Sequence, residues 1–243
     1  MYSIYKKEIN LFLSSLIGYL SVGLFLIGTG LFVWIFPTYS VIDYGFANLD
    51  AFFDMSPYIF LFLIPAITMR MLSEEMQTGT FELLATRPLS DWQIILGKYL
   101  AALSLIAIAL LPTFIYYLSV YELGLPKGNI DSGAAFGSYI GLLLLGAAFA
   151  SVGIFASSLS QNQIVAFLWA LFLSAFCYDA FSNLSKLPIF FGQIDTVIEK
   201  IGISYHYQSI SRGLLDVRDL IYFSSFIAAF LLATKLNLEK RKW

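Results

Sequence analysis

The stretch LFLSSLIGYLSVGLFLIGTGLFVWIF, residues 11–36, holds 26 residues and no charged side chain. A bilayer core of roughly 30 Å is crossed by about 20 apolar residues of helix, so this stretch is long enough to span a membrane. A secretory signal peptide would have an apolar region of roughly 7–15 residues followed by small residues. Because this stretch is longer and ends in Trp34, Ile35 and Phe36, we interpret it as a retained membrane helix.

The composition of the whole chain agrees with a membrane protein. Of 243 residues, 59% are hydrophobic and 12% are charged, whereas soluble domains carry roughly 25% charged residues. A net charge of −2 gives no electrostatic attraction for nucleic acid. The single cysteine, Cys177, and the single histidine, His206, exclude an internal disulfide and a histidine-rich metal cluster. We therefore expect no metal, no nucleic-acid partner and no soluble-enzyme chemistry, but a polytopic protein in a lipid bilayer.

Five further apolar stretches bring the number of predicted spans to six. They cover about residues 57–71, 99–121, 134–157, 164–182 and 217–236. Pro65 and Pro112 lie inside the second and third spans, where proline typically kinks a membrane helix. The sequence thus predicts an all-α polytopic fold with one transmembrane domain over residues 1–243.

The distribution of Lys and Arg sets the expected orientation. With the N-terminus inside, nine of the 14 basic residues fall on the inner side and five on the outer side. The inner residues are Lys6, Lys7, Arg70, Arg87, Lys98, Lys235, Lys240, Arg241 and Lys242. The bias predicts that both termini are cytoplasmic.

The inner loop, residues 72–98, has the signals of short helices with defined ends. Gly79 is placed to end the helix that continues from the second span, because glycine readily adopts the left-handed conformation at a helix end. Thr80 can cap a short helix over residues 81–86, and Pro88 stops it. We expect a transverse amphipathic helix at the membrane surface, or else an ordinary solvated loop.

The end of this loop leads into the third span. Ser90 with Gln93 matches a capping box, which predicts a helix start at this point. Lys98 would then reach the headgroup level, where its ammonium can extend into water.

The outer segment, residues 183–216, predicts two short helices. Apolar residues recur at helical spacing over residues 194–201, Gly202 ends that helix, and a second helix covers about residues 205–214. The candidates for an outer gate or substrate contact are Tyr205, His206, Tyr207 and Arg212. We favour the alternative interpretation, in which these aromatic side chains form a belt that anchors the outer interface.

Polar and small residues inside the spans supply two further expectations. Asp179 lies near the outer end of the fifth span, which favours an interfacial or helix-pairing role, with Lys186 as a partner, over proton coupling. Small residues at four-residue spacing permit close helix approach. They are Gly137 and Gly141 in the fourth span and Ala166, Ala170 and Ser174 in the fifth.

A group of residues in the inner loop carries a family resemblance. The group is Glu74-Glu75, Gly79-Thr80, Glu82-Leu83-Leu84, Pro88 and Gly97-Lys98, and it resembles the signature of type-2 ABC exporter permeases. The resemblance implies a six-helix subunit whose inner loop docks, as a coupling helix, on a dimer of separate ABC ATP-binding subunits. The residues that it assigns to this coupling are Glu74, Glu75, Gly79, Thr80, Phe81, Glu82 and Leu84. The amphipathic stretch over residues 2–9 is similar to the interfacial connector helix of that family.

The resemblance also implies partners and location. Residues 205–222 resemble, more narrowly, permease subunits of gliding-motility-associated ABC transporters of the cell inner membrane. The family pairs two permease subunits, of one kind or two, through the first and fifth helices, so Ala166, Ala170 and Ser174 become the candidate subunit interface.

The sequence lacks the phosphate-binding loop of an ATPase, so this chain is not expected to hydrolyse ATP itself. The chain has no G-x-x-x-x-G-K-[ST] loop, so we expect no cofactor on this chain, and ATP with Mg²⁺ on the partner ATPase. Membrane proteases that use a glutamate pair also need a following arginine and histidines on other spans, which this sequence lacks. Two alternatives to an ATP-driven exporter permease stay open: a passive scaffold of a motility or secretion complex, and a secondary transporter. The latter would need several buried acidic sites near the midplane.

Overall fold

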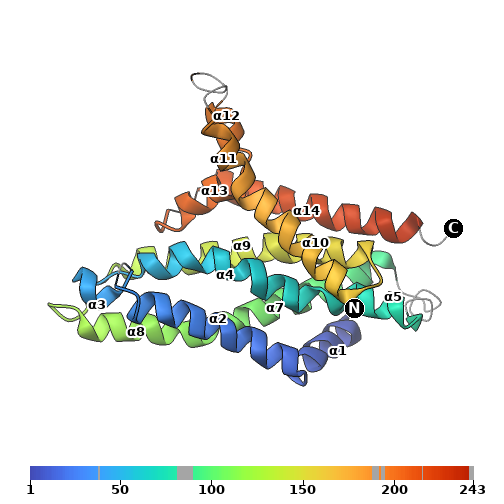
Figure 1. Cartoon of the computed structure of the whole chain (residues 1–243), viewed down its shortest axis with the longest axis horizontal. Coiled ribbons are helices and arrows are strands. Elements are labelled where there is room, and N and C mark those ends of the chain that lie inside the picture. Colours follow the sequence, from blue (N-terminus) through green and yellow to red (C-terminus); the bar gives the residue numbers. More distant parts are fainter. Residues whose placement is uncertain (38, 81–89, 188–191, 193–194, 215, 241–243) are drawn as a thin grey trace.

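The computed structural model describes residues 1–37, 39–80, 90–187, 192, 195–214 and 216–240, and these residues form helices and no strand (Figure 1). The helices are α1 Tyr2–Leu13, α2 Leu16–Trp34, α3 Val41–Tyr44, α4 Asp50–Thr68, α5 Arg70–Gln77, α7 Asp91–Leu110, η1 Leu111–Thr113, α8 Phe114–Leu123, α9 Ser132–Leu159, α10 Gln163–Ala175, η2 Phe176–Ala180, α11 Phe181–Ser185, α12 Asp195–Glu199, α13 Ile203–Ile210 and α14 Val217–Lys240.

Six helical segments of the described chain are long and apolar enough to cross a membrane, which confirms the all-α polytopic fold. They are Leu16–Trp34, Asp50–Gln77, Asp91–Leu123, Ser132–Leu159, Gln163–Ser185 and Val217–Lys240. The first begins later than the expected residue 11, because Ser15 interrupts the helix and its side chain caps α2 by accepting from the Gly18 N–H at 3.1 Å. The other five extend beyond the expected limits, because polar residues at their ends still have helical backbone.

The two prolines act differently on their spans. Pro112 lies in η1, which interrupts the third span between α7 and α8. Pro65 lies within α4, and the interruption of the second span comes four residues later, at Met69 between α4 and α5.

Helix α9 forms the centre of the bundle. In its apolar window 78% of residues are buried, against 22% in the fifth and sixth spans. Helices α4, α7, α10 and α14 pack around α9, and α2 packs against α4. The outward faces of α2, α10 and α14 expose large apolar side chains, as expected of surfaces that contact lipid.

Helix α1 and the last turns of α14 lie toward the same end of the bundle as α5 (Figure 1). Contacts agree, because the Asn237 amide of α14 donates to Ser158 O at 2.7 Å and Lys7 of α1 pairs with Glu75 of α5. At the opposite end, α13 packs on α9 near its start. The two short helices expected in the outer segment are present as α12 and α13, each shorter than expected.

Candidate coupling site

Helix α1 lies against the start of α7, and a glycine permits this contact. A Cβ atom at Gly97 would lie 3.2 Å from Met1 O and 3.3 Å from Ile4 Cβ. The buried face of α1 consists of Ile4, Glu8 and Phe12, which recur every four residues. The acidic side chain of Glu8 is therefore carried into the contact between α1 and the bundle.

Four charges from three helices meet at this contact, and we call them the ionic cluster: Lys7 and Glu8 of α1, Glu75 of α5 and Lys98 of α7. Lys98 Nζ lies 2.6 Å from Glu8 Oε1 and 2.9 Å from Glu75 Oε2. Lys7 Nζ lies 2.7 Å from Glu75 Oε1. Lys98 also donates to Met71 O and is 0% exposed, so its charge is compensated wholly inside the protein.

This burial corrects the expectation that Lys98 reaches the headgroup level. Two carboxylates from other helices surround its ammonium, so their charges compensate for the water that the buried ammonium has lost. Glu8 and Lys7 were not among the predicted site residues. The signal that could have identified Glu8 is its place on the same face of α1 as Ile4 and Phe12.

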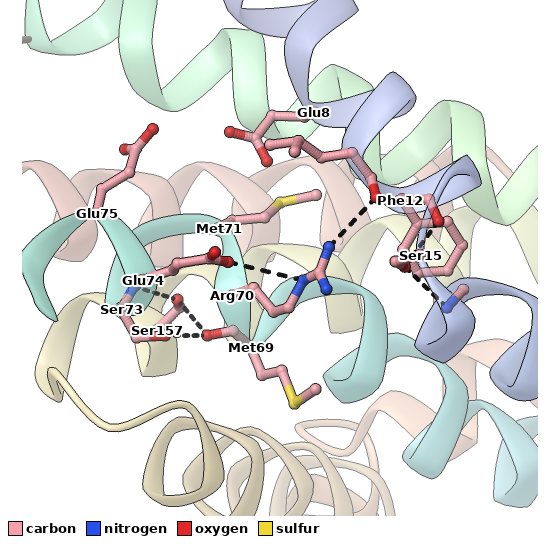
Figure 2. Close-up of polar contacts among 12 residues, drawn as sticks. Glu8, Phe12, Ser15, Met69, Arg70, Met71, Ser73, Glu74, Glu75 and Ser157 are labelled. Atoms are coloured by element: carbon pink, nitrogen blue, oxygen red, sulfur yellow. Dashed lines mark hydrogen bonds and ion pairs between the residues drawn. The ribbon is translucent and has the colours of Figure 1, made fainter. Parts of the chain in front are cut away.

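The two glutamates of the Glu74-Glu75 pair point in different directions. The side chain of Glu75 is 7% exposed and lies in the ionic cluster, whereas that of Glu74 is 46% exposed. Figure 2 shows Arg70 between Glu74 and α1: Arg70 Nε lies 3.8 Å from Glu74 Oε2, and its guanidinium donates to Leu11 O at 3.4 Å. Of the pair, only Glu74 presents a carboxylate toward solvent.

The charge of Lys7 responds to this environment. Partial burial lowers the pKa of its ammonium, but the hydrogen bond that Lys7 donates to Glu75 and the charges of Glu75, Glu8 and Glu74 more than offset this effect. The pKa of Lys7 is therefore raised above its ordinary value of 10.5. The cluster thus holds Lys7 in its charged form.

The junction between α4 and α5 is held by a serine of the central helix. Ser157 Oγ donates to Met69 O at 2.9 Å and accepts from the N–H groups of Leu72 and Ser73 at 3.0 and 3.1 Å (Figure 2). These are backbone groups that an interrupted helix leaves without intrahelical partners. Ser157 was also missed from sequence, because serines occur throughout α9 and nothing local distinguishes this one.

The two edges of the inner loop match their predicted local structure. Gly79 has a φ of +70°, in the left-handed region, directly after α5 and its C-cap Thr78. Ser90 and Gln93 form the predicted capping box at the start of α7. The Thr80 hydroxyl lies 2.9 Å from that of Thr78. The predicted coupling residues Phe81, Glu82 and Leu84 lie outside the described residues.

At the opposite end of the bundle, the candidate gate residues separate. Tyr207 is buried at 2% exposure and its hydroxyl donates to Phe53 O at 2.7 Å, so it packs inside the protein and is not placed to meet a substrate. Tyr205 is 38% exposed. Arg212 lines a cavity of about 550 Å³ together with Asp50, Asp54 and Asp131.

The small residues of the fifth span, which were predicted to form a subunit interface, do not form an exposed face of the single chain. Ala166, Ala170 and Ser174 are each 0% exposed, because α10 turns them toward the interior of the same chain. The exposed side chains of α10 include Leu168 and Phe172, at 57% and 58%.

The small residues of the fourth span also serve packing within the chain. A Cβ atom at Gly137 would lie 2.9 Å from Gly213 Cα, and one at Gly141 would lie 2.6 Å from Ile210 Cγ2. These glycines therefore let α13 and the turn after it approach α9. Asp179 lies half-buried in η2, and the described contacts include no ion pair between it and Lys186.

The comparison with known proteins identifies the family. The family model described as ABC-2 family transporter protein matches residues 2–190. No curated protein matches the chain. The matched range covers most of the 243 residues, including α1, the ionic cluster and the inner loop. The chain therefore belongs to the ABC-2 family of transporter proteins.

Proposed function

We propose that this chain is the permease subunit of an ATP-driven exporter, coupled to a separate ABC ATPase through the inner loop. The observation that carries the proposal is the ionic cluster, which joins α1, α5 and α7 where the loop leaves the bundle and returns to it. Buried ion pairs hold a defined geometry, because separating them leaves charges uncompensated at a cost of about 3–5 kcal/mol. Helices α1, α5 and α7 would then move as one unit.

The two edges of the loop are continuous with membrane spans. Helix α5 follows α4 in the segment Asp50–Gln77, and α7 begins the segment Asp91–Leu123. A displacement of the loop would reach the second span through the Met69 junction, which Ser157 fixes to α9, and would reach the third span directly. Such a displacement would change the relative populations of inward- and outward-open arrangements.

The partners follow from this arrangement. In the proposal, a dimer of ATPase subunits binds ATP with Mg²⁺ and docks on the loop, with Glu74 and Thr80 at the contact and Glu75 acting from inside to hold α5. Both termini are cytoplasmic, in a cell inner membrane, and a second permease, identical or related, completes the transporter. The narrower assignment is to a gliding-motility or related secretion system.

The test is affinity purification of the tagged chain from its own cells in native lipid, followed by mass spectrometry and an ATP-hydrolysis assay. We expect an ABC ATP-binding subunit to co-purify, and ATP hydrolysis to fall at least tenfold when Lys98→Met removes the centre of the ionic cluster. The matched control is Lys127→Met, because the pair of Lys127 with Glu122 is about 60% exposed on both sides. Equal ATPase recovery and activity in both variants would contradict coupling through the cluster. Co-purification without ATP-dependent transport would support a scaffold instead.

A further inference from the structure

His206 is the single histidine of the chain, and both of its ring nitrogens face hydrogen-bond acceptors. Nδ1 lies 2.6 Å from Asp219 Oδ1, in the first turn of α14. Nε2 lies 2.9 Å from the backbone carbonyl oxygen of Lys200, which follows α12. His206 itself is on α13, so one ring connects three consecutive parts of the chain.

The two acceptors limit which ring nitrogens of His206 can be without a proton. A carbonyl oxygen accepts and cannot donate, so Nε2 must carry a proton. Asp219 is 5% exposed, and no other cationic group of the described residues lies within ion-pairing distance of it. In its imidazolium form, His206 directs an N–H group at each acceptor and places a cation beside the buried Asp219 carboxylate.

A second side chain reinforces the same connection. The imidazole stacks on the Tyr222 ring with 3.9 Å between centroids and 20° between planes. The Tyr222 hydroxyl donates to Ile201 O at 2.6 Å. The turn after α12 is thus bound to α14 through His206 and through Tyr222, and an imidazolium is attracted to the face of a tyrosine ring.

The surroundings of the ring contain further charged and titratable groups on the segments that pack around α13. They are Glu199 and Lys200 before α13, Tyr205 and Tyr207 on it, Arg212 and Asp216 after it, Arg218, Asp219 and Tyr222 on α14, Cys177, Tyr178 and Asp179 on η2, and Tyr139 on α9. Several of these line a cavity of about 480 Å³ beside the ring, through which protons and water can reach it.

We propose that His206 is a pH-responsive latch that holds the α12–α13 connection against α14 while its ring is protonated. Loss of one proton leaves a single N–H for two acceptors, so either the Lys200 carbonyl or the buried Asp219 carboxylate loses its partner. Because a hydrogen bond to a charged group contributes to stability and a buried unpaired carboxylate is costly, the connection opens. The latch is closed at acidic pH and opens as the pH rises. The inference concerns the end of the bundle opposite the ionic cluster and does not depend on the proposed ATPase coupling.

The test uses the full chain in lipid nanodiscs with ¹⁵N-labelled histidine. Because His206 is the single histidine, the nitrogen spectrum reports its ring without assignment ambiguity. Hydrogen exchange of the peptide covering residues 195–210 is measured over the same pH series and corrected for intrinsic exchange. We expect two protonated ring nitrogens at acidic pH, and exchange about tenfold faster once one proton is lost, as for the loss of one charged hydrogen bond.

The variants separate the latch from general packing. His206→Phe keeps an aromatic ring on Tyr222 and removes both hydrogen bonds, so we expect fast exchange at every pH. Gln208→Ala is the matched control, an exposed position on the same helix, and should keep the wild-type profile. A bare ring nitrogen at acidic pH, or a ring that loses its proton without faster exchange, would overturn the proposal. The ring spectrum of the unmodified chain decides the first point even if a variant fails to fold.

Discussion

Replacement of Lys98 by methionine is the most informative perturbation of the ionic cluster. The cluster contains two cations and two carboxylates, and Lys98 is the cation that pairs with both carboxylates, with Glu8 at 2.6 Å and with Glu75 at 2.9 Å. Methionine has a similar length and no charge, so it leaves Glu8 and Glu75 buried with Lys7 as their one cation, and Lys7 is in contact with Glu75 alone. Breaking a buried pair by removing one partner costs about 3–5 kcal/mol. That cost corresponds to an opening of α1 from the bundle that is roughly 10² to 10⁴ times more frequent.

The assay is hydrogen exchange of the peptides covering residues 2–13 and 70–77 in nanodiscs, with thermal unfolding of the same sample. The double variant Glu8→Gln with Lys98→Met removes one charge of each sign, so we expect it to recover more than half of the loss. Lys127→Met should leave exchange and thermal unfolding at the values of the parent, because its pair with Glu122 is exposed to solvent. The reasoning is refuted if Lys98→Met exchanges like Lys127→Met, or if the double variant is as unstable as the sum of the single ones.

Three further predictions address the surroundings of the cluster. Gly97→Val should displace the start of α1, because a Cβ atom at this position would lie 3.2 Å from Met1 O. Hydrogen exchange of residues 2–13 should therefore become faster. Gly23→Val should leave that exchange unchanged, because no atom lies within 4 Å of a Cβ atom at Gly23. Ser157→Ala should destabilise the junction between α4 and α5 by about 1–3 kcal/mol, measured as faster exchange of residues 69–73, because it leaves buried backbone groups unpaired. The raised pKa of Lys7 means that its stabilising contribution is present below pH 10.5 and is lost as the pH rises through the higher folded-state value. Unfolding measured between pH 9 and 12 should show this loss, and Lys7→Met should remove it; an identical pH profile in the variant would contradict it.

Much of the fold could be predicted from sequence because its signals are local. Six apolar stretches give six candidate spanning helices, since each helix is long and apolar enough to cross a membrane. The capping box of Ser90 and Gln93 and the left-handed Gly79 were predictable for the same reason: their partners lie within three residues or within the backbone itself.

The ionic cluster could not be predicted in this way, because its members are distant in sequence. Lys98 and Glu8 are 90 residues apart, and hydropathy alone places an isolated lysine at the membrane surface. Small residues give a similar ambiguity. The spacing of Ala166 and Ala170 indicates close helix contact, but it does not say whether the neighbour belongs to the same chain, as it does here, or to a second subunit.

In the proposed mechanism, the inner loop of the permease meets the ATPase subunit. The most direct measurement places a photo-crosslinking amino acid at Thr80, which is exposed directly after Gly79, and at Tyr205 as the control at the opposite end of the bundle. Crosslinking is performed in native membranes, and the products are identified by mass spectrometry. We predict a crosslink from Thr80 to an ABC ATP-binding subunit whose yield changes when ATP is added, and none from Tyr205. Crosslinking of that subunit from Tyr205, or its absence at Thr80 while the subunit co-purifies, would contradict the account.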